Sequence, residues 1–542
     1  MIESAVLAAS AHPAPAAEPV AGWRGRAGAA LLVVGALAVV LAWVPSELFD
    51  LERYLVPKSL VLHLVALGLL LLGLAPTTRG AWGRTGLLLA LFVAWSAASA
   101  LLATNRWLAL AAWGVSFSSA VVFLTARALP RGLRWPALAG ILTAVVVAAA
   151  LGVAQAYGYQ SSWLSDSRPP GGTFGNRNFL GHLAAIAAPA LLMTALRARR
   201  GGGAALALLG LGVLAALIVL TRSRAAWLGG IGGVAAAVVA LVFAARRGGA
   251  PLRSGRLLAG GVVAAAAIAV AVLVPNDLDW VADAPYAATL GRIADYSEGS
   301  GRGRLIQYRN SLALVPRNPI FGSGPGNWFV DYPLVTTDGD PAYAGAEAIP
   351  TNPWPSSDWV ATLAERGAIG TLLLLAAGGA ALAAALRRRE DGHGAEGASE
   401  SPFAAGAVAG VLCAVFVCGS FDAVLLLPAP ALVTWASLGL MLPRPSARGA
   451  SWGPGASLWL RRGALTAAAV LALATAAHTT AIALTASSRQ TAALARAARL
   501  APGEHRLRLT LARRGGRCDD ARAAARLMPN HQRVTRLAAR CG

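Results

Sequence analysis

Residues 203–244, GAALALLGLGVLAALIVLTRSRAAWLGGIGGVAAAVVALVFA, decide the fold class. Two long apolar runs, 203–221 and 226–244, are separated only by a short polar turn that contains Arg222 and Arg224. Each run has the roughly 17–25 residues that a helix needs to cross the hydrocarbon core of a bilayer. The stretch therefore predicts two antiparallel membrane-spanning helices joined by a tight turn.

The same apolar pattern recurs along the chain. A soluble domain typically carries about a quarter charged residues, whereas this sequence is 56% hydrophobic and only 13% charged. Pro428 and Pro430 shorten one of the runs. We therefore expect an all-α polytopic membrane protein with about 12 or 13 transmembrane helices, over the runs 27–45, 59–75, 85–103, 107–125, 136–156, 179–196, 203–221, 226–244, 257–274, 358–386, 402–426, 428–442 and 463–486.

Arginine is distributed unevenly over the connecting loops. If the N-terminus is cytoplasmic, the inward loops hold 21 arginines and the short outward loops hold seven basic residues. This asymmetry follows the positive-inside rule and predicts the orientation of the protein in a bacterial inner membrane. The net charge of +22 is thus interpreted as a topology signal, and nucleic acid is not an expected partner.

Four segments depart from the span pattern. Residues 1–26 are expected in the cytoplasm, and 387–401 form a polar cytoplasmic linker within the transmembrane domain 27–486. The outward loop 275–357 is rich in aromatic residues, and a loop of that length is usually functional. Residues 487–542 form a periplasmic helical tail, because alanine and leucine recur there at helical spacing in a pattern resembling a tetratricopeptide hairpin.

The tail also predicts a disulfide. Cys518 and Cys541 flank a stretch that is expected to form two short helices hinged at Pro529. A hairpin of that length brings its ends close together, and paired cysteines persist in an oxidising compartment. No spacing of histidine, cysteine and carboxylate residues suggests a metal site, and no cofactor is expected.

Four arginines stand at the outward ends of predicted helices, against the charge bias of the chain. Arg168 and Arg177 precede the sixth span, and Arg222 and Arg224 lie between the seventh and eighth. Planar guanidinium groups bind phosphate bidentately, so such a group is suited to a lipid-linked diphosphate. The alternative for each of them is an interfacial arginine that reaches lipid headgroups.

Four motifs in order resemble the O-antigen ligase and polymerase superfamily. They are GTFGNRNFLGH after Arg168, SRAAWLGG, RGRLIQYRNSLALVPRNPIFGSGPGNW and SDWVATLAERGAIG, within residues 140–440. The resemblance implies a GT-C-like membrane glycosyltransferase that uses an undecaprenyl-diphosphate glycan at the periplasmic face, with neither metal nor nucleotide sugar. It implies that Arg168 and Arg224 bind the donor's diphosphate and that Arg304 belongs to the site.

One family feature is absent from this sequence. The family's characteristic histidine precedes the step matched by Ser357, Asp358 and Trp359, and the chain has Ser356 at that position. Serine does not act as a base unaided, so Asp358 and His182 are the alternative candidates to deprotonate an acceptor hydroxyl. Asp358 is equally explained as a helix-initiating carboxylate, and His182 as a packing residue.

The preferred function is therefore metal-independent, inverting transfer of a polyprenyl-diphosphate-linked glycan, as in lipopolysaccharide biosynthesis. The acceptor is left open among the lipid A-core (O-antigen ligase), another lipid-linked glycan (polymerase) and a protein hydroxyl. The alternative from another class is a non-catalytic membrane subunit or a transporter, for which Ser356 is the main argument. Charged residues near one membrane face disfavour a transporter, whose sites usually lie near the midplane.

Overall fold

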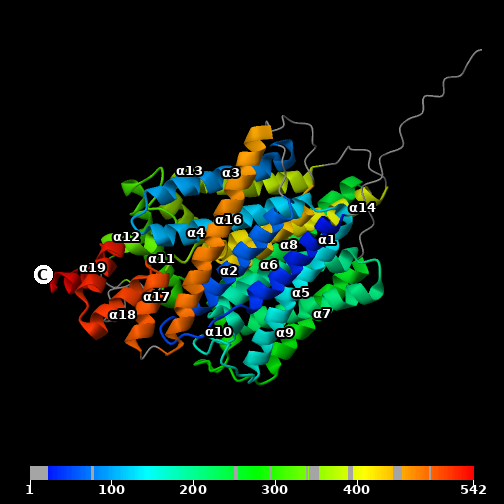
Figure 1. Cartoon of the computed structure of the whole chain (residues 1–542). Coiled ribbons are helices and arrows are strands. Elements are labelled where there is room, and N and C mark those ends of the chain that lie inside the picture. Colours follow the sequence, from blue (N-terminus) through cyan, green and yellow to red (C-terminus); the bar gives the residue numbers. More distant parts are fainter. Residues whose placement is uncertain are drawn as a thin grey trace, which may run out of the picture.

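The computed structural model describes residues 22–74, 79–248, 254–292, 295–336, 340, 353–387, 395–443, 454–487 and 490–541. Within these residues the regular structure is helical throughout, without strands (Figure 1). Twelve helices are long and apolar enough to cross a membrane, which confirms the all-α polytopic fold. The helices that contain these spans are α1 (Trp23–Leu41), α2 (Glu52–Leu71), α3 (Arg79–Leu101), α4 (Arg106–Ala128), α5 (Arg131–Ala156), α6 (Arg177–Arg197), α7 (Gly201–Leu220), α8 (Arg224–Gly248), α9 (Ser254–Leu273), α13 (Asp358–Leu386), α14 (Ala395–Phe421) and α16 (Pro454–Ala483).

The short apolar run 428–442 forms α15 (Pro428–Met441), all of which is buried. Its 14 residues extend about 21 Å at 1.5 Å per residue, less than the roughly 30 Å of a hydrocarbon core. At its far end, the guanidinium groups of Arg127 and Arg134 donate to the carbonyl oxygens of Pro443 and Leu442. The turn 422–427 before α15 therefore lies inside the bundle, where Asp422 is only 9% exposed.

Helix α6 lies at the centre of the bundle and packs against α5, α7, α8 and α14. Of its membrane-spanning window, 94% is buried, so α6 faces protein rather than lipid. Asn176 caps its first turn by accepting a hydrogen bond from the backbone N–H of Asn178. This cap places Arg177 at the helix N-terminus and leaves His182 in the interior one turn later.

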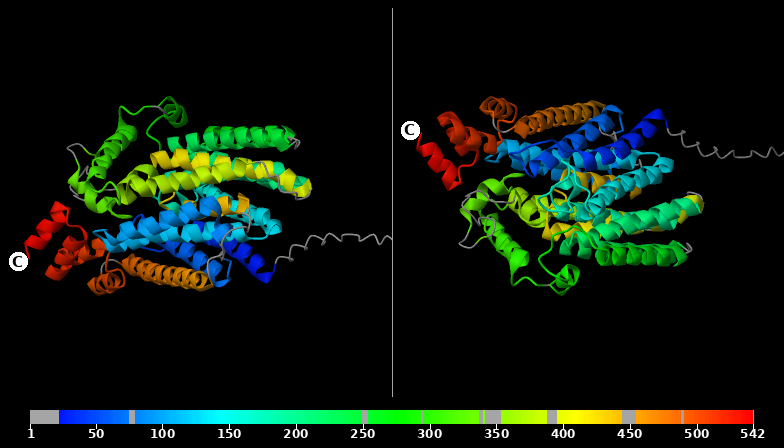
Figure 2. Two further views of the ribbon diagram at one scale, coloured as in Figure 1. Left: turned by 90° about the horizontal axis from the view of Figure 1, so that it is seen from above. Right: turned by 90° about the horizontal axis from the view of Figure 1, so that it is seen from below.

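The segment between α9 and α13 contains α10 (Pro285–Gly291), α11 (Gly299–Leu312), α12 (Trp328–Asp331) and three-residue 3₁₀ helices at Val315–Arg317 and Tyr332–Leu334. The tail contains α17 (Thr491–Leu500), α18 (His505–Gly515), α19 (Cys518–Leu527) and α20 (Gln532–Ala539). Figure 2 shows this segment and the tail at the same end of the helix bundle, which we call the loop end. The connection between α6 and α7 lies at the opposite end.

The P-x-x-G-x-G turn of the sequence joins the loop to a break in α13. Gly367 interrupts α13 with φ 67°, which frees backbone groups of the helix. Backbone N–H groups of Ser323 and Gly324 donate to the carbonyl oxygens of Ala364 and Glu365, and Ala368 donates to that of Pro319. A side chain at Gly322, where φ is 70°, would come within 2.3 Å of the Glu365 backbone. The motif thus fixes the loop that carries α11 to α13.

Glu365 and Arg366 form a charged pair just before this break in α13. Arg366 Nη1 donates to Glu365 Oε2 at 3.1 Å, and both side chains are buried. Glu365 Oε1 also accepts from the backbone N–H of Trp328 at the start of α12. The carboxylate therefore links the start of α12 to the part of α13 just before the break.

The tail packs against the loop end through two apolar clusters. Leu509, Ala524, Met528 and Val534 contact the α12 region, including Trp328 and Phe329. The second cluster joins α17 and α18 to the end of α16 and to Phe49. Arg506 forms an ion pair of 2.7 Å with Glu52 at the start of α2. The four tail helices are thus packed onto the bundle; their assignment as tetratricopeptide-like repeats stays a prediction.

Candidate functional site

The turn between α7 and α8 holds Arg222 in an unusual backbone conformation. Its φ is 51°, in the left-handed region that residues other than glycine rarely adopt. Its Nε donates to Thr289 Oγ1 of α10 at 2.9 Å. Burial lowers the pKa of Arg222, while Tyr286 acts in the opposite direction. A strained, partly desolvated cation points to a functional position, because backbone strain concentrates at ligand-binding sites.

Trp280 brings two of the predicted arginines together. The guanidinium carbons of Arg177 and Arg222 lie 4.8 and 4.5 Å from the centre of its ring. Arg168 and Arg222 both lie close enough to Arg177 for their positive charges to interact electrostatically with it. The indole Nε1 of Trp280 is itself buried without a hydrogen-bond acceptor among the described residues. Three cations and an unpartnered donor therefore gather where α6, α7, α8 and α9 end.

The loop before α6 is held to α5 and to the first residue of α6. Gln155 of α5 donates to the carbonyl oxygen of Ser165 and accepts from the backbone N–H of Gly172. The backbone N–H of Arg177 donates to the carbonyl oxygen of Arg168 at 3.2 Å, which fixes the two residues relative to each other. The Arg168 side chain is exposed. The loop therefore presents Arg168 and Arg177 from a rigid support.

Lys58, the only lysine of the chain, completes that support. Its ammonium is fully buried and donates to the carbonyl oxygens of Val40 and Ala42, at 3.3 and 2.9 Å, and to Thr173 Oγ1 at 3.4 Å. The ring of Phe174 lies 4.6 Å from Nζ. Three acceptors match the three donors of an ammonium group, so Lys58 joins the end of α1 to the turn 172–174.

We expect Lys58→Met to lower the stability of the protein by about 1.5–3 kcal/mol, the usual value of hydrogen bonds to a charged group. Lys58→Arg should not restore it, because a planar guanidinium does not replace a compact ammonium in a closed pocket. The midpoint of thermal unfolding in detergent measures the effect, with the neighbouring substitution Ser59→Ala as the control. A Lys58→Met protein that melts like the wild type would show that this support is dispensable.

Arg224 lies at the same end but makes different contacts. Its Nη1 donates to the carbonyl oxygens of Arg292 and Asp295 at 2.6 and 2.9 Å, and its Nη2 donates to Ser300 Oγ at 3.3 Å. In this structure the guanidinium therefore binds the segment between α10 and α11. Its predicted contact with the diphosphate stays a prediction.

Arg304 and Tyr308 project from α11 toward the turn that follows α14. The Tyr308 hydroxyl lies 2.5 and 2.8 Å from the carbonyl oxygens of Ser356 and Ser420, to which it donates. Burial raises the pKa of Tyr308; Arg304 lowers it, and Asp422 and Tyr296 raise it. Tyr308 therefore connects α11 to the segments before α13 and α15, close to Arg304 and Asp422.

Asp422 is the carboxylate of this cluster that the sequence analysis missed. Its Oδ1 accepts from the backbone N–H of Ala423 at 2.9 Å, and its Oδ2 accepts weakly from Asn178 Nδ2 at 3.4 Å. The charges of Asp422 and Arg304 also interact electrostatically with the ring of His182, so both groups lie near it. A signal was present in the sequence, because Asp422 is the one charged residue of the apolar run 402–426, where an ionisable group is costly and usually functional.

His182 is buried between α6 and the α7–α8 turn. Its Nε2 lies 3.3 Å from Ser223 Oγ, and its Nδ1 has no hydrogen-bond partner among the described residues. The ring is thus close to the residue between Arg222 and Arg224. Its role as a base stays a prediction.

Asp358 is occupied by the backbone. Its Oδ1 accepts from the N–H groups of Val424 and Leu426, and its Oδ2 accepts from Leu425 at 2.8 Å. The carboxylate therefore holds the turn that follows Asp422 in place. Ser357 caps α13 by accepting from Trp359 and Val360, and Ser356 receives a hydrogen bond from Tyr308 on its carbonyl oxygen. These contacts are structural, and the base role predicted for Asp358 stays a prediction.

A comparison with models of protein families finds a match for the central part of the chain. Residues 207–375 match the family model described as O-Antigen ligase. This segment is therefore similar to the O-antigen ligase family. The match confirms the resemblance predicted from the sequence motifs, and it includes Arg222, Arg224, Arg304 and Asp358. None of the curated proteins compared with the chain matches it.

The similarity to the O-antigen ligase family supports a role in glycan transfer by a multi-pass, glycosyltransferase-like membrane enzyme. It also implies a lipid-linked glycan and an acceptor as partners. Arg168, Arg177 and His182 precede the segment that matches the O-antigen ligase model, and Asp422 follows it. Among the described residues, no group of three or more histidine, cysteine or acidic side chains is arranged to hold a metal ion.

Proposed function

We propose that the protein transfers a glycan from a polyprenyl-diphosphate carrier to an acceptor hydroxyl at the loop end of the bundle. The observation that carries the proposal is the pair Arg177 and Arg222 on the ring of Trp280. Two cations held beside one ring repel each other, and a bound anion with two phosphates relieves that repulsion. Arg168 completes the group, and Arg224 at the start of α8 and Arg304 of α11 lie at the same end of the bundle.

The arginines also explain how the leaving group departs. As the bond between the anomeric carbon and the diphosphate oxygen breaks, negative charge develops on that oxygen. Guanidinium groups positioned beforehand stabilise this charge in the transition state more than in the bound donor. We infer that these cations supply the neutralisation that a divalent metal provides in other transferases, so that the reaction is metal-independent.

We assign the base to Asp422 in preference to Asp358. Asp422 is buried in the recessed turn, and its Oδ2 has only the weak contact with Asn178, whereas both oxygens of Asp358 accept from backbone N–H groups at 2.8–3.4 Å. Asp422 takes the proton from the acceptor hydroxyl as its oxygen attacks the anomeric carbon. The C–O bond to the diphosphate breaks on the opposite face, which inverts the configuration and releases polyprenyl diphosphate. His182 lies where it polarises the same region.

The orientation forms part of the proposal. The arginine asymmetry implies that the loop end faces the periplasm and the opposite end faces the cytoplasm. Gly291 and Gly202, at the two ends, each have open space around the position of an added side chain. We expect Gly291→Cys, and not Gly202→Cys, to react with a membrane-impermeant thiol reagent in intact inner-membrane spheroplasts. Labelling of the wild type gives the background, and preferential labelling of Gly202→Cys would reverse the topology.

Deletion of the gene tests the function in cells. A transferase defect should make polyprenyl-linked glycan accumulate at the periplasmic face, because the carrier is loaded and translocated but not unloaded. A translocation defect would instead leave the donor at the cytoplasmic face, in favour of a transporter. An unchanged donor pool would argue for a non-catalytic subunit. Which of lipid A-core, glycan or protein remains unmodified in the deletion strain identifies the acceptor.

A further inference from the structure

The exposed charges of the tail are almost entirely cationic. Among residues 490–541 a single acidic side chain, Asp519, is exposed, and the other two acids, Glu504 and Asp520, are buried. Ten arginines are exposed there: Arg496, Arg499, Arg513, Arg514, Arg517, Arg522, Arg526, Arg533, Arg536 and Arg540. Such an excess creates a field that attracts anions.

The arginines of the last two helices follow helical spacing. Arg522 and Arg526 are four residues apart on α19. On α20, Arg533 and Arg536 are three residues apart, and Arg540, four residues further on, is the residue that caps the helix. Residues at these separations share one face of a helix, and like charges in such positions repel each other. A ligand that carries several negative charges relieves this repulsion.

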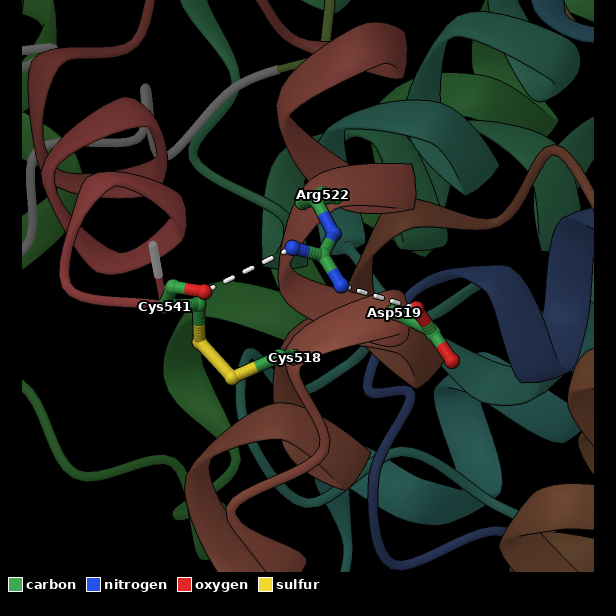
Figure 3. The surroundings of a disulfide bond; sticks show 4 residues. All are labelled: Cys518, Asp519, Arg522 and Cys541. Atoms are coloured by element: carbon green, nitrogen blue, oxygen red, sulfur yellow. Dashed lines mark hydrogen bonds and ion pairs between the residues drawn. A yellow bond between two sulfur atoms is a disulfide. The ribbon is translucent and has the colours of Figure 1, made fainter.

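A disulfide holds the two helices together. Cys518 at the start of α19 is bonded to Cys541 after α20, with Cα atoms 5.4 Å apart. Figure 3 shows Arg522 beside this bond, with hydrogen bonds of 3.5 Å to the carbonyl oxygen of Cys541 and 3.1 Å to Asp519 Oδ1. The cross-link therefore keeps the arginines of α19 and α20 on one rigid unit.

The composition of the surface restricts the kind of partner. Protein interfaces depend on buried aromatic and apolar anchors, but residues 490–541 contain no Phe, Trp or Tyr. Leu500 is the one large apolar side chain that is well exposed in the described tail. The absence of aromatic rings also removes the usual platform for neutral sugars. The surface is therefore suited to negative charges, which guanidinium forks bind bidentately.

The position of the tail distinguishes a soluble polyanion from a lipid surface. Figure 2 shows the C-terminal end of the tail projecting beyond the ends of the membrane-spanning helices. Electrostatic attraction to headgroups falls off over a Debye length of about 8 Å. The tail also packs on the α12 region, in the same loop as Arg304 and Tyr308. A polymer bound by α19 and α20 is thus kept beside the proposed transfer site.

We propose that the arginine surface of α19 and α20 binds an acidic glycan, a polymer with repeated carboxylate or phosphate groups that serves as acceptor or is transferred. The assignment of the ligand as a glycan rests on the proposed function. The binding itself does not require transfer, so the two proposals fail separately. The disulfide positions the surface, and the bound polymer lies along both arginine rows.

Hydrogen–deuterium exchange on the full-length protein in nanodiscs of zwitterionic lipid tests this proposal. Polygalacturonate is the acidic probe, and dextran of similar length is the neutral one. We expect polygalacturonate, and not dextran, to slow exchange in peptides from 513–541, with an effect that weakens as salt increases. In the triple variant Arg533→Gln, Arg536→Gln and Arg540→Gln, the same protection should require at least a tenfold higher concentration of polygalacturonate.

The matched control is Arg26→Gln, Arg246→Gln and Arg461→Gln, three exposed arginines at the opposite end, which should leave protection of the tail unchanged. Circular dichroism establishes that both triple variants remain folded. Equal protection in the α20 triple variant, or none in the wild type, would overturn the proposal. Protection by phosphatidylglycerol nanodiscs without polymer would identify a membrane-binding surface instead, and protection by polyglutamate but not by polygalacturonate would identify an acidic protein partner.

Discussion

Replacement of Asp422 by Asn is expected to reduce glycan transfer by about 10²–10⁴-fold, the usual contribution of a general base. The amide is nearly isosteric, and its oxygen retains the hydrogen bond from the backbone N–H of Ala423. Donor binding and the melting temperature should therefore change little, because the substitution removes the proton acceptor and keeps the fold. Single-turnover transfer with saturating donor measures the chemical step directly.

Asp358→Asn is the matched comparison for this prediction. An amide has one acceptor oxygen, whereas Asp358 accepts from three backbone N–H groups of the turn 424–426. We expect Asp358→Asn to lower the melting temperature, because the amide NH₂ group would then face backbone N–H groups of the turn, donor against donor. If Asp358→Asn is folded and inactive while Asp422→Asn is active, the base is Asp358 and the assignment to Asp422 is wrong.

The second large effect is expected at the paired arginines. Arg177→Ala and Arg222→Ala should each weaken donor binding by about 1.5–3 kcal/mol, as the loss of a hydrogen bond to a charged group does. Each loss corresponds to roughly a 10- to 150-fold higher Kd, since about 1.4 kcal/mol is a factor of ten. Lysine should restore only part of the affinity, because it lacks the planar fork.

Arg106→Ala provides the control for the arginine variants. Arg106 lies at the loop end at the start of α4 and is exposed, so its removal changes the same surface charge without touching Trp280. Binding of a labelled polyprenyl-diphosphate glycan to the protein in nanodiscs measures the effect. Equal losses in Arg106→Ala and Arg222→Ala would reduce the pair to a general electrostatic contribution and contradict a specific diphosphate site.

The sequence patterns predicted the helices well, because crossing a bilayer imposes a length and an apolar composition that are visible residue by residue. Pro428 and Pro430 shorten the run 428–442, and in the structure this run forms the 14-residue helix α15, which is completely buried. The turn 422–427 enters the bundle, and the carboxylate of Asp358 satisfies its backbone N–H groups. No local pattern connects Asp358 to residues 66–68 positions further along the chain.

The candidate site was predictable only in part. Charge bias singled out Arg168, Arg177, Arg222 and Arg224, but not the ring of Trp280 that brings Arg177 and Arg222 together, because that contact depends on the path of the chain after α9. The sequence shows Lys58 as its only lysine, but its three acceptors come from the end of α1 and the loop before α6. Tertiary packing of distant segments decides such contacts.

Transfer by the purified protein in liposomes tests the central claim most directly. The assay contains polyprenyl-diphosphate-linked glycan and, in separate reactions, lipid A-core, a second lipid-linked glycan or a protein acceptor, with a chelator of divalent metals present. We predict that the glycan moves to one of these acceptors and that one polyprenyl diphosphate is released for each transfer. Tight donor binding without transfer to any of the three acceptors would contradict the account.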